Sequence, residues 1–262
     1  MNLVELYKSK KYTMPIVTII FAITCLIVSI PTYFDNKLIY VFATYSKPSF
    51  FWQYFSGIFE HTIFNLVTGE LAPMSLFLHL GINLTILLLF GLIIERNLGS
   101  NKMFIITFVA GAFNILAGRI IASSILNMEN PASVGASGIV YAYVPIALYI
   151  IVKALKEKKN YNQVLTYVYV VTIIVIYIVI TCVASFSATN LWHLIATVIG
   201  ITFLFIYKKS IHREFSEKIS GNNTTKIKMN KALLGLIIIP LLMIGILIAY
   251  KYQIIQIPFI IN

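Results

Sequence analysis

The chain has 262 residues, of which 59% are hydrophobic and only 11% charged, with a mean hydropathy of +0.89. Soluble domains carry about 25% charged residues, so a soluble globular protein is excluded and an all-α polytopic membrane protein is predicted. The net charge of +11 does not indicate a nucleic-acid partner. The basic residues lie in short segments between apolar runs, which is a signal of membrane topology.

Runs of about 20 apolar residues predict membrane-spanning helices. In chain order there are seven, at roughly 14–34, 73–95, 103–125, 135–152, 163–184, 190–207 and 232–250. The first is too long for the core of a signal peptide and no small-x-small cleavage site follows it, so we expect it to be retained. With the N-terminus in the cytoplasm, 16 of the 20 basic residues lie on the inner side, which the positive-inside rule favours.

This topology divides the chain into four parts. They are a cytoplasmic N-terminus (1–13), a six-helix core (14–207), a basic cytoplasmic linker (208–231) and an accessory seventh helix with an outer tail (232–262). Within the core, residues 35–72 form a long outer loop. Its aromatic run at 50–55 predicts a segment lying in the outer interface of the bilayer, and the alternative is an aromatic belt flanking a span.

Four polar residues share one depth near the outer surface. Ser137, His193, His79 and Asn83 lie on three predicted helices that all run inward. Each also has a purely structural interpretation, because a serine among glycines is most often a packing residue and side chains at i and i+4 can bond a neighbouring helix. Polar groups inside a membrane are costly and tend to be functional, so their shared depth favours a site.

The inventory of reactive residues narrows the chemistry. Asp35 is the single aspartate, which excludes a pair of aspartates sharing a proton, and the zinc-protease pattern His-Glu-x-x-His is absent from the sequence. Cys25 and Cys182 both fall in apolar runs and suggest neither a disulfide framework nor a metal site. We therefore expect no cofactor and no metal.

The remaining possibility is a serine–histidine dyad. His193 would take the proton of the Ser137 hydroxyl and return it to the leaving amine. His79, Asn83 and the backbone N–H of Ser137 could stabilise an oxyanion. The glycines around the serine, Gly135 and Gly138, would leave the backbone bare so that a peptide can approach.

These residues, in this order and at this depth, resemble the rhomboid family of intramembrane serine proteases over roughly residues 50 to 207. The resemblance implies that Ser137 is the nucleophile, that His193 is the general base, and that Tyr141 stacks on this histidine. The matching motifs are His79-Leu80-Gly81-Ile82-Asn83, Glu95-Arg96-Asn97-Leu98-Gly99-Ser100, Gly135-Ala136-Ser137-Gly138 with Tyr141, His193, and Ala196 with Gly200 where the family has Gly-x-x-x-Gly.

The resemblance also implies an endopeptidase that cuts transmembrane proteins near the outer end of a helix. The seventh span has almost no polar residues, which predicts an accessory helix on the lipid face in a six-plus-one arrangement. Two departures are visible: Trp52-Gln53 stands where the family has Trp-Arg, and the segment Thr62 to Ala72 is long. His61 and His212 fall outside the spans and are expected to be dispensable. A composition rich in Ile, Lys and Asn favours a bacterial plasma membrane.

Two other function classes compete with the protease. A catalytically silent relative that binds membrane clients would typically lack the serine or the histidine, and this chain keeps both Ser137 and His193. A transporter usually has an internal repeat and polar features near the midplane. No repeat is evident here, and the inner half of the core is largely apolar. The sequence predicts neither the identity of the substrate nor the oligomeric state.

Overall fold

The computed structural model describes residues 15–45, 48–62, 73–124, 133–158, 188–220 and 231–252. Over these ranges the chain is helical, and its only β-type pairing is an isolated bridge between Thr44 and Ser133. The all-α prediction is therefore confirmed for the described residues. The main helices are α2 (Ile16–Phe34), α4 (Pro73–Leu98), α5 (Ser100–Ser124), α6 (Ser137–Lys158), α8 (Ala188–Ser220) and α9 (Lys231–Lys251), with a short α3 (Ile39–Phe42) after α2.

Six of the seven predicted spans coincide with these long helices, and the seventh, 163–184, lies outside the described residues. Three described helical segments are long and apolar enough to cross a membrane, namely Ile16–Phe34, Leu76–Leu98 and Trp192–Ile211. Parts of α5, α6 and α9 form shorter apolar helices. One boundary differs from the expectation: α8 continues to Ser220, so the first part of the basic linker at 208–231 is helical.

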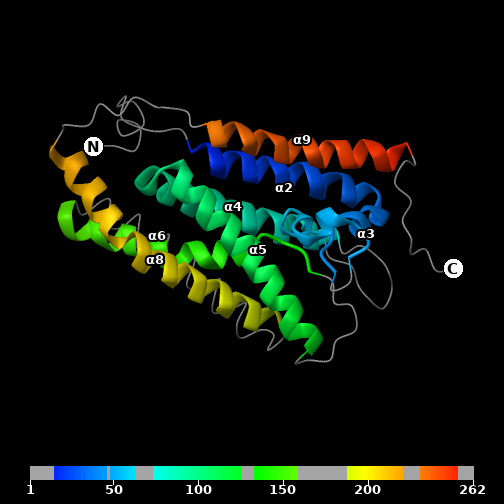
Figure 1. Ribbon diagram of the computed structural model, residues 1–262, viewed down its shortest axis with the longest axis horizontal. Coiled ribbons are helices and arrows are strands. Elements are labelled where there is room, and N and C mark those ends of the chain that lie inside the picture. Colours follow the sequence, from blue (N-terminus) through cyan, green and yellow to red (C-terminus); the bar gives the residue numbers. More distant parts are fainter. Residues whose placement is uncertain are drawn as a thin grey trace.

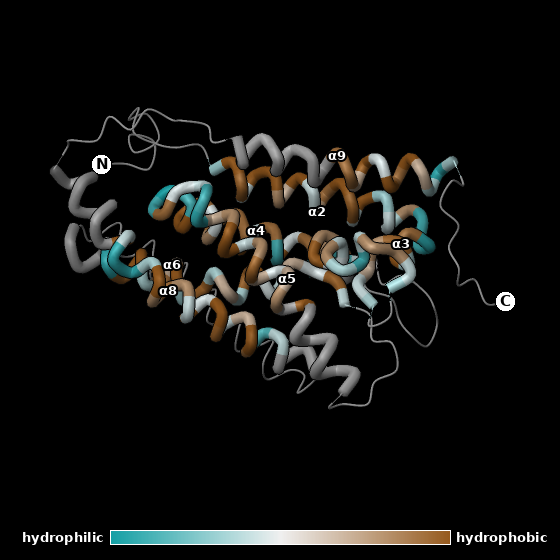
Figure 2. The backbone as a smooth tube through the Cα atoms, in the orientation of Figure 1, coloured by the Kyte–Doolittle hydropathy of each residue, from teal (hydrophilic) through white to brown (hydrophobic). Residues whose placement is uncertain are grey.

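The helices pack as a bundle in which α6 lies between α4 and α8, and α4 also contacts α2 (Figure 1). The last helix, α9, lies along α2. Tyr250 on α9 donates a hydrogen bond to Asp35 at the end of α2, with 2.9 Å between the oxygens. Hydrophobic residues dominate these helices, while hydrophilic residues gather toward helix ends (Figure 2). The last helix, α9, therefore packs against the bundle mainly through α2.

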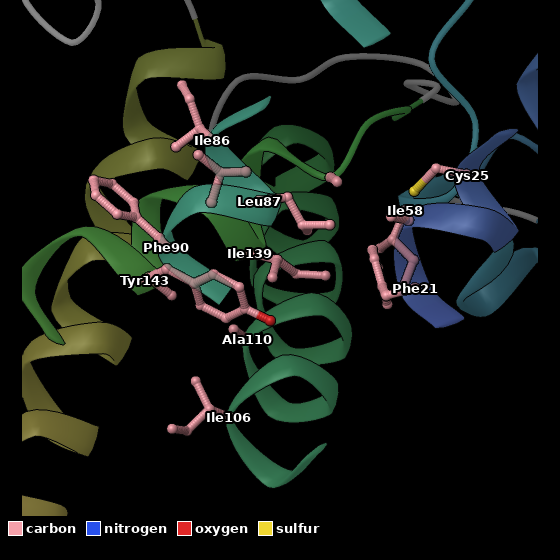
Figure 3. Close-up of a cluster of buried hydrophobic side chains, with 14 of the residues drawn as sticks. Phe21, Cys25, Ile58, Ile86, Leu87, Phe90, Ile106, Ala110, Ile139 and Tyr143 are labelled. Atoms are coloured by element: carbon pink, nitrogen blue, oxygen red, sulfur yellow. The ribbon is translucent and has the colours of Figure 1, made fainter. Parts of the chain in front are cut away.

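The centre of the bundle is filled by apolar side chains from α4, α5 and α6 (Figure 3). Phe90, Ile106 and Tyr143 are completely or almost completely buried there. The hydroxyl of Tyr143 would be costly to bury alone, and it lies 2.5 Å from the hydroxyl of Thr107 on α5. This packing fixes α6 against its neighbours below the level at which Ser137 lies.

A buried carboxylate joins α2 to the C-terminal end of α4. Glu95 accepts hydrogen bonds from the backbone N–H groups of Val17 and Thr18, both at 2.9 Å, and from the Thr18 hydroxyl at 2.7 Å. The first N–H groups of a helix have no partner within the helix, so Glu95 supplies what α2 lacks. The turn that follows is closed by Gly99, whose φ of 82° suits glycine and whose N–H donates to the Glu95 carbonyl at 2.7 Å.

The described part of the outer loop is folded and not an extended linker. It contains α3 and three 3-10 turns, Asn36–Leu38, Phe51–Tyr54 and Ser56–Ile58. The Trp52 indole donates to the Val41 carbonyl at 2.9 Å. Gln53, at the position of the family arginine, is buried and donates to the Tyr40 carbonyl at 2.6 Å. Phe51 is 78% exposed, and the interfacial placement of this aromatic run stays a prediction.

Candidate active site

Ser137 is the first residue of α6. The chain reaches it through Gly135, which has a φ of 106°, a conformation that residues with a side chain rarely adopt. A Cβ at Gly135 would lie 2.8 Å from Cε1 of the His79 ring, so only glycine leaves room for this ring beside the serine. Gly138 is buried within the first turn of the helix. The two glycines thus serve the local fold on either side of Ser137.

His193 lies on α8 and packs flat against α6. Its ring stacks on Tyr141, with 4.0 Å between the ring centroids and 7° between the planes. Tyr141 follows Ser137 by one turn on α6, so the stacking holds His193 beside the helix that carries the serine. The side chain of His193 is only 8% exposed, and both of its ring nitrogens lack a hydrogen-bond partner within the described ranges.

Small residues bring α8 close enough to α6 for this contact. Gly200 faces the backbone of Ala142, and a Cβ there would collide with the Ala142 carbonyl and lie 2.8 Å from Cγ of Pro145. Ala196, one turn nearer to His193, is fully buried. Close approach through small side chains is a common way to pack helices in membranes. The distance between Tyr141 and His193 therefore depends on the small side chains of Ala196 and Gly200.

His79 and Asn83 both lie on α4, and hydrogen bonds define the role of each polar atom. Nδ1 of His79 lies 3.1 Å from the carbonyl oxygen of His61. A carbonyl only accepts, so this nitrogen carries the proton, and Nε2 of the neutral ring is an acceptor. The Asn83 amide donates to the His79 carbonyl at 2.8 Å, which leaves its second N–H free to donate elsewhere. Oδ1 of Asn83 is buried without a partner among the described residues.

The outer loop contributes a residue whose place could not be read from the sequence. His61 is completely buried, and its Nε2 accepts a hydrogen bond of 3.0 Å from the backbone N–H of Ala136. Its Nδ1 lies 3.1 Å from the Phe59 carbonyl. His61 was expected to be dispensable because it lies outside the predicted spans. The structure shows that it nevertheless contacts the residue before Ser137. Its partner is a backbone group, which leaves no signal in the sequence.

Burial keeps His61 in the form that this contact requires. Removal from water, reinforced by the neighbouring His79, lowers the pKa of His61 from 6.5 to about 3. The ring is therefore neutral at physiological pH, and Nε2 retains the lone pair that accepts the Ala136 N–H. The adjacent Glu60 is also buried, and burial raises the pKa of its carboxyl group although the hydrogen bonds it accepts from Thr32, Thr62 and the His61 backbone oppose this shift.

Glu60 fastens this part of the outer loop to α2. One carboxylate oxygen accepts from the Thr32 hydroxyl at 2.7 Å. The other accepts from the backbone N–H groups of His61 and Thr62 at 2.9 and 2.8 Å and from the Thr62 hydroxyl at 2.6 Å. Every one of these donors would be costly to bury without an acceptor.

The described residues contain no group of three metal-ligating side chains.

Apolar helices long enough to cross a membrane define an integral, multi-pass membrane protein. Near one end of its bundle lie Ser137 at the start of α6 and His193 stacked on Tyr141. A family model for the Rhomboid domain matches residues 48–210 of the chain. The chain therefore belongs to the rhomboid family. Among curated proteins, no sequence matches it significantly.

Proposed function

We propose that this protein is an intramembrane serine endopeptidase that hydrolyses peptide bonds of transmembrane substrates with a Ser137–His193 dyad. The observation that carries the proposal is the stack of His193 on Tyr141 at 4.0 Å. It holds an imidazole, whose two nitrogens have no hydrogen-bond partner among the described residues, against the helix whose first residue is Ser137. Membership of the rhomboid family supports the same activity.

In this mechanism a ring nitrogen of His193 takes the proton of the Ser137 hydroxyl while Oγ attacks the substrate carbonyl. The C–N bond then breaks, and His193 returns the proton to the leaving amine. Water, deprotonated by the same histidine, hydrolyses the acyl-enzyme and releases Ser137. Both ring nitrogens of His193 lack hydrogen-bond partners in the described structure. Catalytic hydrogen bonds are often long before substrate binds, and binding would bring the hydroxyl and the imidazole together.

The oxyanion would be held by the backbone N–H of Ser137 and by the free N–H of Asn83. The Ser137 N–H lies at the first turn of α6, where N–H groups have no partner within the helix. His79 can add a third donor only when its ring is doubly protonated, because Nδ1 of the neutral ring already donates to the His61 carbonyl. Asn83 is therefore the side-chain donor that the neutral site supplies.

Covalent labelling tests the assignment of the nucleophile. A fluorophosphonate should modify Ser137 of the purified protein in detergent, because the adjacent imidazole activates this hydroxyl. Peptide mass spectrometry locates the adduct, and Ser137→Ala serves as the control. The same preparation is incubated with a panel of model transmembrane substrates. An adduct on a different serine, or cleavage without any labelling of Ser137, would contradict the dyad.

We further propose that the N-terminus is cytoplasmic, which places the outer loop and Ser137 on the external side. Asn36 and Asn101 offer a matched pair for testing this orientation, since both are exposed asparagines near opposite ends of the bundle. In a background without Cys25 and Cys182, Asn36→Cys should react with a membrane-impermeant thiol reagent in intact cells. Asn101→Cys should react only after permeabilisation. The reverse pattern would refute the orientation.

A further inference from the structure

The residues just before Ser137 are held almost entirely by the outer loop. We define residues 133–137 as the serine segment. Ser133 pairs with Thr44 through two backbone hydrogen bonds of 2.8 and 3.0 Å, and the Gly135 N–H donates to the Gly57 carbonyl at 2.8 Å. The Ala136 N–H donates to Nε2 of His61 at 3.0 Å. Three of these contacts use loop backbone, and the fourth uses a side chain that a mutation can remove.

Different contacts orient the two peptide groups on either side of Ala136: His61 holds the N–H of the Gly135–Ala136 group, and α6 holds the carbonyl of the Ala136–Ser137 group. The Ala136 carbonyl accepts the first hydrogen bonds of α6, from the N–H groups of Ile139 and Val140 at 2.9 and 3.0 Å, so it points along the helix. In a trans peptide the N–H of the next residue points the opposite way. The Ser137 N–H is thus directed out of the helix, toward the region where an oxyanion would form. His61 binds the N–H of Ala136, so both polar groups of the Ala136 backbone are held by hydrogen bonds.

His61 also sets the tautomer of His79. The backbone carbonyl of His61 accepts a hydrogen bond from the protonated Nδ1 of His79. The centroids of the two rings lie 5.2 Å apart. The ring of His61 is itself oriented by the Phe59 carbonyl at 3.1 Å and the Ser29 hydroxyl at 3.3 Å. One loop residue thus contacts the serine segment through its side chain and α4 through its main chain, and it is tied to α2 as well.

We infer that His61 is a positioning residue of the active site, whose neutral Nε2 holds the Gly135–Ala136 peptide group and, through it, the backbone that leads into Ser137 in the orientation that catalysis requires. The inference rests on the proposed protease activity of Ser137. His61 touches no reacting atom in this role. It acts through the Ala136 N–H, and its loss should lower the rate of the chemical step more than it weakens substrate binding.

Two neutral polar substitutions separate this role from general stabilisation. In His61→Gln the side-chain amide reaches the position of Nε2 and can accept from the Ala136 N–H. In His61→Asn the shorter amide reaches only the position of Nδ1, so it can still donate to the Phe59 carbonyl but leaves the Ala136 N–H without an acceptor. The Gln variant thus keeps the bond to Ala136 and gives up the one to Phe59, whose carbonyl still accepts from the Ser29 hydroxyl, and the Asn variant does the reverse.

We expect His61→Asn to lower kcat on the order of 10²-fold, as is typical when a catalytic group is displaced by about 1 Å, with little change in KM. His61→Gln should stay within about tenfold of the wild-type kcat. Fluorophosphonate labelling of Ser137 should slow in parallel. Hydrogen–deuterium exchange of peptides covering residues 133–140 reports the contact directly, and exchange should accelerate in the Asn variant and return toward the wild-type rate in the Gln variant.

The outcomes distinguish the inference from the proposed function. If the wild-type protein shows no cleavage that depends on Ser137, the protease assignment is overturned. With an active wild type, a folded His61→Asn protein that keeps the wild-type kcat overturns the inference about His61. Equal losses in both folded variants overturn it too. Should His61→Asn fail to fold, a folded Gln variant with a kcat near that of the wild type supports the inference, and one with a hundredfold lower kcat refutes it.

Discussion

Ser137→Ala and His193→Ala will each abolish cleavage of a transmembrane substrate, and the double variant will be no worse than either single one. A nucleophile and its base act as one unit, so removing either costs nearly as much as removing both. The stack of His193 on Tyr141 places the imidazole beside α6, and both of its nitrogens lack a partner among the described residues. The measurement is the initial rate of cleavage in detergent or liposomes, with melting temperatures as a check on folding.

Three further variants calibrate this result. Asn83→Ala removes one oxyanion donor and should leave slow but measurable cleavage, reduced by about 10²–10³. His79→Ala should also leave measurable cleavage, because the Ser137 N–H and Asn83 remain. His212, farther along the helix that carries His193, is the histidine control and should be dispensable. Full activity in His193→Ala would show that His193 is not the base, and total loss in His212→Ala would show that His212 is not dispensable.

Gly200→Ala will destabilise the bundle and impair cleavage together. A single Cβ at this position collides with the Ala142 carbonyl, and backbone cannot rotate away as a side chain can. Overpacking of this kind costs about 1–3 kcal/mol. Relief requires α8 to move off α6, which separates His193 from Tyr141 and Ser137, and a displacement of about 1 Å in an active site can cost 10²-fold in rate.

Two other helical glycines are matched controls for Gly200→Ala. A Cβ at Gly81 on α4 or at Gly245 on α9 would meet no atom of the described residues within 4 Å. Gly81→Ala and Gly245→Ala should therefore change the free energy of unfolding by no more than about 0.5 kcal/mol. Denaturation in mixed micelles gives the stability, and the cleavage assay gives the rate. A Gly200→Ala protein as stable and as active as these controls would contradict the proposed coupling of helix packing to the site.

The fold of the outer loop could not be predicted from the sequence. Hydropathy separates spans from connections, and it left residues 35–72 out of the spans. It cannot say that a connection folds back and becomes buried, because this depends on backbone hydrogen bonds to distant residues. Gln53, Glu60 and His61 are all buried, and each is satisfied chiefly by partners without sequence signature. The expectation that His61 is dispensable rested on hydropathy, which does not register such contacts.

The candidate site shows the same division within single residues. Periodicity and depth were enough to bring Ser137, His193, His79 and Asn83 together as candidates. The proton on Nδ1 of His79 could not be predicted, because it follows from one carbonyl 3.1 Å away. Nor could sequence spacing show that Gly135 has a φ of 106° and faces the His79 ring. These facts decide which donors the neutral site offers.

The sequence by itself determined that this is a helical membrane protein and which polar residues its helices carry, because burying apolar side chains in lipid depends on composition and helical spacing alone. The tertiary structure decided that α9 lies along α2, that Gly200 brings α8 against α6, and that His61 holds Ala136. Those contacts join residues far apart in the chain. They depend on side-chain shape and on the directions of backbone N–H and C=O groups, and a linear pattern encodes neither.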